Sequence, residues 1–207
     1  MPRWLPALLL LLSTAPTLAR AAEWQPQRMR YEDSRVRVAG EALGLSLRAV
    51  AGIERDDHRI ECHYQHWRGE RRLLQTTACW LNQYAAHFGV APRVQPAIAN
   101  YPFISKSKIR WGREDEVQLA RGRYGVRWFA IGRLTCFGFI TLYGRDDTTA
   151  RPNHLLKGFY CQEGGLDGER RLTVLRAIGY EHEHFGFPAR PPVDAEVLDH
   201  DPRTADR

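Results

Sequence analysis

The densest run of aromatic and β-branched residues lies between residues 123 and 161 and predicts three β-strands. Residues 124–131 and 134–143 flank Gly132-Arg133, which is a turn signal, and a third strand is expected at 155–161 after a polar loop. In the middle strand, alternate residues fall on opposite faces of the sheet. The expected faces are Phe137, Phe139, Thr141 and Tyr143 on one side, and Leu134, Cys136, Ile140 and Leu142 on the other.

Weaker alternation predicts further strands in the first half of the chain. Residues 36–50 are expected to form a strand with a turn at 39–41, and residues 58–67 a second strand followed by a turn at 68–70. Residues 71–88 fit a helix or a strand, and we favour a strand through Trp80 followed by a short helical turn that ends at Gly89. The remaining expectations are a proline-containing loop or edge segment at 91–105, which is a candidate boundary between two halves, and short strands at 106–111 and 117–120 around a turn at 114–116.

A helix over 168–178 is expected after the three strands, because Asp167 is a good N-cap residue and Gly179 a good helix stop. This order of elements predicts an α+β fold, mainly an antiparallel β-sheet with a C-terminal helix packed on one face. The expected parts are an N-terminal β-rich half at 22–90, an antiparallel sheet plus helix at 91–187, in one domain or two, and a disordered charged tail at 188–207.

The first 21 residues have the pattern of a secretory signal peptide. Arg3 gives a positive start, an apolar run follows from Leu5 to Leu12, and Ala19-Arg20-Ala21 offers small residues for cleavage. No later segment approaches the ~18 apolar residues that a membrane-spanning helix needs. We therefore expect an exported chain that starts at Ala22 and is periplasmic or secreted.

The sequence has four cysteines, and an even number in an exported chain points to disulfides. Three pairings are possible. Proximity in the sequence favours Cys62 with Cys79 and Cys136 with Cys161, so two disulfide-stapled hairpins are expected. The chain has no Cys-x-x-Cys motif, which argues against a thioredoxin-type redox site.

Some of these features also occur together in other proteins. The segments Cys136-Phe137-Gly138-Phe139 and Lys157-Gly158-Phe159-Tyr160-Cys161, followed by a capped helix ending at Ala177-Ile178-Gly179, resemble the C-terminal part of uncharacterised exported proteins of proteobacteria. The resemblance implies a disulfide-stapled exported domain. It implies no activity.

The balance of charge in the chain is basic. The formal net charge is +6 at pH 7, and loss of Arg3 and Arg20 with the signal peptide lowers it to +4. Basic and aromatic residues interleave over 106–133, an arrangement that suits an anionic ligand but also an ordinary half-buried strand with a solvated face. The residues that we assign to anionic-ligand binding are Arg123, Arg127, Arg133 and Trp128.

The sequence lacks the common motifs for catalysis and cofactor binding. It contains no Gly-x-Ser-x-Gly, no His-Glu-x-x-His, no phosphate-binding loop and no dinucleotide fingerprint, so no catalytic residue and no cofactor are assigned. His58, Cys62 and His66 share one face of a regular strand, but residues four apart on a strand are about 13 Å apart and cannot bind one ion. The short His182-Glu183-His184 motif lies near the tail, and no metal site is expected.

One segment is similar to the opening of thermonuclease-like barrels, namely 38–43 together with 47–54. In this segment Ala39 and Glu41 stand where that family has its metal-binding Asp residues, so the resemblance implies at most a degenerate barrel without calcium chemistry. The sequence favours a non-enzymatic binding or structural domain. Its expected partner is an anionic envelope component or another exported protein. The alternatives are a hydrolase with a dispersed active site and the degenerate barrel.

Overall fold

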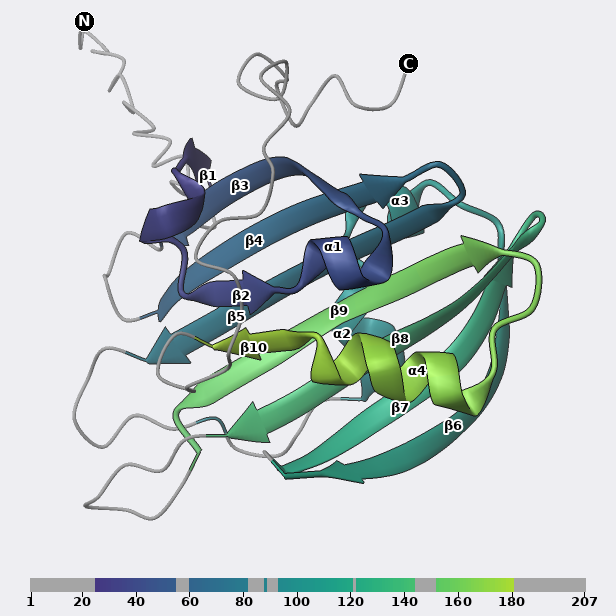
Figure 1. Cartoon of the computed structure of the whole chain (residues 1–207). Coiled ribbons are helices and arrows are strands. Elements are labelled where there is room, and N and C mark those ends of the chain that lie inside the picture. The colour runs from purple at the N-terminus through teal and green to yellow at the C-terminus, as the bar shows by residue number, and fades with distance from the viewer. Residues whose placement is uncertain are drawn as a thin grey trace, which may run out of the picture.

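The computed structural model describes residues 25–54, 60–81, 88, 93–120, 122–143 and 152–180. Its centre is an eight-stranded sheet in which every neighbouring pair of strands is antiparallel (Figure 1). The prediction of a mainly antiparallel sheet is therefore confirmed. In spatial order the strands are β1 (Gln25–Arg28), β3 (Ser46–Glu54), β4 (Ile60–Gly69), β5 (Arg72–Leu81), β9 (His154–Glu163), β8 (Leu134–Tyr143), β7 (Gly122–Ile131) and β6 (Ile109–Leu119).

Small elements lie over both faces of this sheet. One face is packed against β2 (Val36–Val38), β10 (Ile178–Tyr180) and the short helix α1 (Gly40–Leu43), with the 3-10 turn η1 (Tyr31–Asp33) beside them. Val174 and Leu175 of helix α4 (Gly168–Arg176) are buried in the same cluster of core residues. The helices α2 (Val94–Ile98) and α3 (Pro102–Ser105) lie over the other face, behind the sheet in Figure 1. Because both faces of the sheet are covered, both need apolar residues. The two sets of β8 residues that the sequence assigned to opposite faces do pack in different core clusters, so this prediction is confirmed.

The two halves of the sheet have matching architecture. The hairpins β4–β5 and β8–β9 both consist of ten-residue strands, and β5 pairs with β9 at the centre of the sheet. β1 and β3 flank the first hairpin on its outer side, and β6 and β7 flank the second. Counted from either edge of the sheet inwards, the strands follow one another in chain order. An approximate two-fold axis between β5 and β9, perpendicular to the sheet, therefore relates the halves. Both predicted halves contribute strands to the eight-stranded sheet, and β2 and β10, one from each half, form a second, two-stranded sheet.

The disulfides occupy equivalent positions in the two hairpins. Cys62 and Cys136 are the third residues of β4 and β8, and Cys79 and Cys161 are the eighth residues of β5 and β9. The expected pairs Cys62–Cys79 and Cys136–Cys161 are both formed, between residues that lie directly opposite each other on neighbouring strands. The Cα atoms are 4.0 and 4.1 Å apart. Both disulfides lie on the face that α2 and α3 cover.

The expectation of a loop or edge segment at 91–105 is wrong, because the structure has α2 and α3 within its described part, 93–105. Their apolar residues recur at helical spacing, and Val94, Ile98 and Ile104 are at most 3% exposed against the sheet. Pro102 is the first residue of α3, the one helical position where proline loses no hydrogen bond. Pro96 is the third residue of α2, so it and Pro102 both lie in the first turn of a helix, where backbone N–H groups have no intrahelical acceptor.

Three other boundaries differ from expectation. The turn expected at 114–116 is part of β6, whose pairing with β7 is interrupted only by a bulge between Trp111 and Glu114. The strand expected at 36–50 is divided into β2, α1 and β3, because Gly44 adopts a left-handed conformation (φ 67°) that ends α1. The C-terminal helix ends at Arg176 with Ala177 as its C-cap, so the last residue expected in it, Ile178, begins β10, which pairs with β2.

Several predictions fall on residues outside the described part of the chain. These are the signal peptide at 1–21, the start of the strand at 58–67, the helical turn before Gly89, most of the loop at 144–153 and the tail at 188–207. Among the described residues, no helix combines the length and the apolar character that a membrane crossing needs.

Candidate functional site

The residues predicted to bind an anionic ligand are divided between the two faces of the sheet. Arg123 and Arg127 are on the side of α2 and α3, since residues two apart on a strand share a face. Trp128 points to the opposite side, where it packs against Phe137. Arg133 lies in the turn between β7 and β8 and is exposed. The four residues therefore do not form one surface.

Two of the predicted arginines already have carboxylate partners on the neighbouring strand β6. Arg123 lies 3.5 Å from Glu116, and Arg127 lies 3.8 Å from Glu114. The guanidinium of Arg127 also lies 5.3 Å from the centre of the Trp111 ring, in a cation–π contact. These ion pairs lower the positive potential that the two arginines present to a ligand.

Trp128 is part of a hydrogen-bonded cluster that joins β6, β7 and α4. Its Nε1 donates to Asp115 at 3.0 Å, and the same carboxylate oxygen lies 3.2 Å from both Arg113 and Arg171. The hydrogen bond from Trp128 and the charges of the two arginines lower the pKa of Asp115. The arrangement gives Trp128 a structural role between the strands and the helix.

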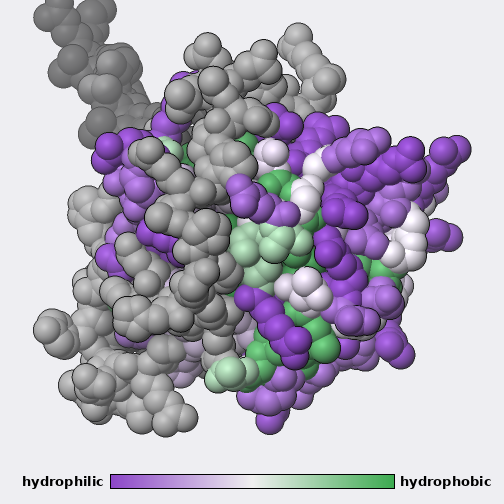
Figure 2. Space-filling model, in the orientation of Figure 1, coloured by the Kyte–Doolittle hydropathy of each residue, from purple (hydrophilic) through white to green (hydrophobic). Residues whose placement is uncertain are grey.

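The fourth predicted residue, Arg133, belongs to a larger group of cations at one end of the sheet. The start of β6, the β7–β8 turn and the β4–β5 turn all lie at this end, because Ile109 is opposite Ile131 and Arg72 is opposite Gln162. Hydrophilic side chains project along this edge of the molecule in Figure 2, at the right of the view. We define the basic end by its four exposed cations, Arg68, Lys108, Arg110 and Arg133.

The cations of the basic end differ from Arg123 and Arg127 in their surroundings. None of the four forms an ion pair with a carboxylate in the part of the chain that the structure describes. A nearby acid, Glu163, is engaged with Arg71 at 3.4 Å. A second acid, Glu70, is exposed in the same β4–β5 turn as Arg68. Cations without an ion-pair partner create a positive field that attracts anions over about one Debye length, roughly 8 Å at physiological salt.

Arg68 was not among the residues predicted from the sequence. It follows the buried Trp67 of β4, and its place before Gly69 in the sequence is typical of a turn residue. It lies at the same end of the sheet as Arg133 because the hairpins β4–β5 and β8–β9, far apart in the chain, are neighbours in the sheet. Spacing along the sequence carries no signal for this proximity.

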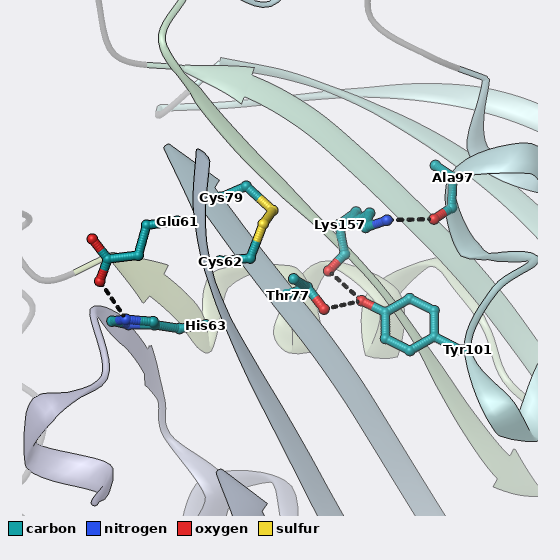
Figure 3. Close-up of a disulfide and its surroundings, with 8 residues drawn as sticks. All are labelled: Glu61, Cys62, His63, Thr77, Cys79, Ala97, Tyr101 and Lys157. Atoms are coloured by element: carbon teal, nitrogen blue, oxygen red, sulfur yellow. Dashed lines mark hydrogen bonds and ion pairs between the residues drawn. A yellow bond between two sulfur atoms is a disulfide. The ribbon is translucent and has the colours of Figure 1, made fainter. Parts of the chain in front are cut away.

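His63 is the described histidine closest to the arrangement that a hydrolase would need. It is 2% exposed, and its Nε2 lies 3.1 Å from Glu61 (Figure 3). Its Nδ1 accepts a hydrogen bond from the backbone N–H of Arg35 at 2.8 Å. Because both ring nitrogens are engaged, neither is left to take a proton from a nucleophile.

A second polar cluster lies across the sheet from His63, beside the Cys62–Cys79 disulfide (Figure 3). The Tyr101 hydroxyl donates to Thr77 Oγ1 at 2.7 Å and is 3.3 Å from the carbonyl oxygen of Lys157. The Lys157 ammonium donates to the carbonyl oxygen of Ala97 at 2.9 Å, which joins β9 to α2. Burial lowers the pKa of Lys157 and raises that of Tyr101. The cluster fixes the helices onto the sheet.

The residues considered as metal ligands are described only in part. Cys62 is held in a disulfide, and no group of three His, Cys, Asp or Glu side chains suited to a metal ion is found in this part of the chain. His58, His182 and His184 lie outside it.

The described site is therefore a surface rather than a catalytic constellation. It consists of cations from three separate segments, held at one end of a disulfide-bonded sheet. Comparisons of the chain with protein-family models, with curated proteins and with solved structures find no match.

Proposed function

We propose that this chain is an exported, disulfide-bonded domain that binds an anionic component of the cell envelope through its basic end. The binding is non-enzymatic in this proposal. In this proposal helix α4 covers one face of the sheet. The partner binds at the end of the sheet.

Export is supported by the disulfides and by the first residues of the chain. Both disulfides are buried, with no cysteine more than 6% exposed, and the structure has no free cysteine. Structural disulfides of this kind persist in oxidising compartments such as the periplasm. A signal-like N-terminus of 21 residues agrees with that compartment.

The observation that carries the proposed binding is the set of exposed cations without carboxylate partners. The ion pairs of Arg123 and Arg127 show that acids of β6 lie beside basic residues of β7. At the basic end the same sheet leaves Lys108, Arg110 and Arg133 uncompensated among the described residues. A group of like charges costs stability through mutual repulsion, and an anionic partner offsets that cost.

The test compares two double variants with the same change in net charge. Lys108→Glu/Arg133→Glu reverses two cations of the basic end. The control, Arg30→Glu/Arg123→Glu, reverses two arginines whose side chains are 73% and 70% exposed and already paired with acids. We expect about tenfold weaker binding to heparin, used as a polyanion probe, for the first variant and a much smaller loss for the control.

Equal losses in the two variants would show that heparin responds to net charge alone. Unchanged retention of Lys108→Glu/Arg133→Glu would remove the basic end as the binding surface. Thermal unfolding of each variant checks that the fold is intact before binding is measured.

A further inference from the structure

An apolar row runs along the basic end on the face of α2 and α3. Ile109, Ile131 and Leu134 lie opposite one another on β6, β7 and β8, in the last row of paired residues before the turn. All three are half-buried and pack against the core on that face. We call these three residues the apolar row.

The cations alternate with this row along the chain. Lys108 and Arg110 flank Ile109, and Arg133 lies in the two-residue turn between Ile131 and Leu134. Because neighbouring residues of a strand point to opposite faces, Arg110 lies on the other face of the sheet from Ile109. The end of the sheet therefore carries the apolar row on one face, with cations across the edge and in the turn. Long basic side chains can extend past such a row and keep their charges in water while their stems cover apolar surface.

We propose that the basic end docks on an anionic lipid bilayer, with the apolar row at the level of the headgroups. This inference rests on the proposed function, because it names the anionic component. A surface for a soluble polyanion needs charge alone, whereas an anionic bilayer offers charge and an apolar phase within a few ångströms of each other. Exposed cations without ion-pair partners, together with partly buried aliphatic residues at the same end of the sheet, match both properties of the bilayer.

The arrangement also sets how the domain lies on the membrane. Because the apolar row lies at one end of the sheet, that end contacts the bilayer through β6, β7 and β8. The opposite end of the sheet, where β9 begins and β5 ends, then faces away from the lipid. The cations draw the protein to the surface, and the apolar row supplies the part of the binding that salt does not screen.

The experiment measures partition of the disulfide-bonded protein onto vesicles of phosphatidylglycerol mixed with phosphatidylcholine, and onto phosphatidylcholine alone. The key variant is Ile109→Thr/Ile131→Thr, which keeps β-branched residues in both strands and removes apolar surface. We expect it to bind the anionic vesicles about tenfold more weakly, while its retention on heparin stays that of the unaltered protein. Lys108→Glu/Arg133→Glu should bind both the anionic vesicles and heparin more weakly.

The outcomes separate this inference from the proposed function. If Ile109→Thr/Ile131→Thr binds anionic vesicles as well as the unaltered protein, lipid docking is overturned while polyanion binding stands. If Lys108→Glu/Arg133→Glu keeps its heparin binding, the proposed function itself fails. A measurement on the unaltered protein guards against a variant that does not fold: injection under a phosphatidylglycerol monolayer should raise the surface pressure, and no rise would also overturn the inference.

Discussion

At the scale of single residues, Lys157 is a cation held where burial works against its charge. Its ammonium has one backbone acceptor, Ala97, and burial lowers its pKa. We predict that Lys157→Met raises the free energy of unfolding at pH 7 by about 1 kcal/mol, because it removes a buried charge and keeps an unbranched apolar chain. Urea denaturation measures this change. A loss of stability would mean that the bond to Ala97 outweighs the desolvation of the ammonium.

The same residue makes a signed prediction about pH. Because the folded-state pKa of Lys157 is lowered, the unfolded chain binds more protons between that value and the ordinary lysine pKa of about 10.4. The contribution of Lys157 to the free energy of unfolding therefore rises with pH between these two pKa values and is constant below the lower one. The difference in unfolding free energy between Lys157→Met and the unaltered protein should shrink as pH is raised from 7 to about 10.5. A constant difference would contradict the lowered pKa.

The Tyr101 hydroxyl has the opposite character, a buried neutral group with its hydrogen bonds made. Tyr101 is 6% exposed and donates to Thr77 at 2.7 Å. Tyr101→Phe should cost about 1–2 kcal/mol, because Thr77 loses a buried partner. Thr77→Val and the double variant complete a cycle that isolates the pair, and additive losses would show that the two groups do not interact.

At the scale of elements, each hairpin is closed by one disulfide. The cysteines are separated by 17 and 25 residues, for which the chain-entropy model gives roughly 3 kcal/mol each and a difference of only a few tenths. Replacing Cys62 and Cys79 together, or Cys136 and Cys161 together, with alanine should therefore lower the unfolding free energy by similar amounts. Urea denaturation of the two double variants makes the comparison. A loss confined to one hairpin would show that the other is stable without its disulfide.

Helix α2 depends on the absence of a side chain beneath it. A Cβ atom on Gly138 of β8 would lie 2.5 Å from the Ile98 side chain and 2.8 Å from the Val94 side chain, so these buried side chains would have to shift. Gly138→Ala should cost about 1–3 kcal/mol. Gly165→Ala is the matched control, because a Cβ there has open space and Gly165 has no positive φ. Equal thermal midpoints for the two variants would mean that α2 adjusts without loss.

The elements predicted well from the sequence are those with local signals. The β7–β8 turn, the faces of β8 and the N-cap of α4, where Asp167 accepts a hydrogen bond from the backbone of Arg170 at 2.7 Å, all depend on neighbouring residues. The pairing of β2 with β10 joins Val36 to Tyr180 and has no local signal. The acids of β6 suggested a turn because edge strands carry charges for solubility, a pattern that sequence alone does not distinguish from a loop.

The candidate site was predicted only in part for the same reason. Arg133 is exposed and has no ion pair among the described residues, while Arg123 and Arg127 pair with Glu116 and Glu114, acids of β6 that the sequence pattern placed in a turn. Arg68 joins the site through the order of strands in the sheet. The composition predicts cations on the surface, but the topology decides which of them lie together.

At the scale of the whole molecule, the two disulfides tie the stability of the sheet to the redox state of its surroundings. Their combined contribution of about 6 kcal/mol is comparable to the 5–15 kcal/mol that separates most folded domains from their unfolded state. Both link strands at the centre of one sheet, so their loss affects the same cooperative unit. The reduced chain should therefore be close to the limit of stability.

We accordingly predict that the protein folds well only where its disulfides form. Protein recovered after export should begin at Ala22, show no free thiols and unfold at a higher urea concentration than the same chain treated with a reductant. Thiol titration, N-terminal sequencing and urea denaturation supply the three measurements. Free thiols in the folded exported protein, or equal unfolding midpoints with and without reductant, would contradict the prediction. A different N-terminus would move the cleavage site and leave the disulfide argument intact, since the cysteines lie within the sheet and not in the leader.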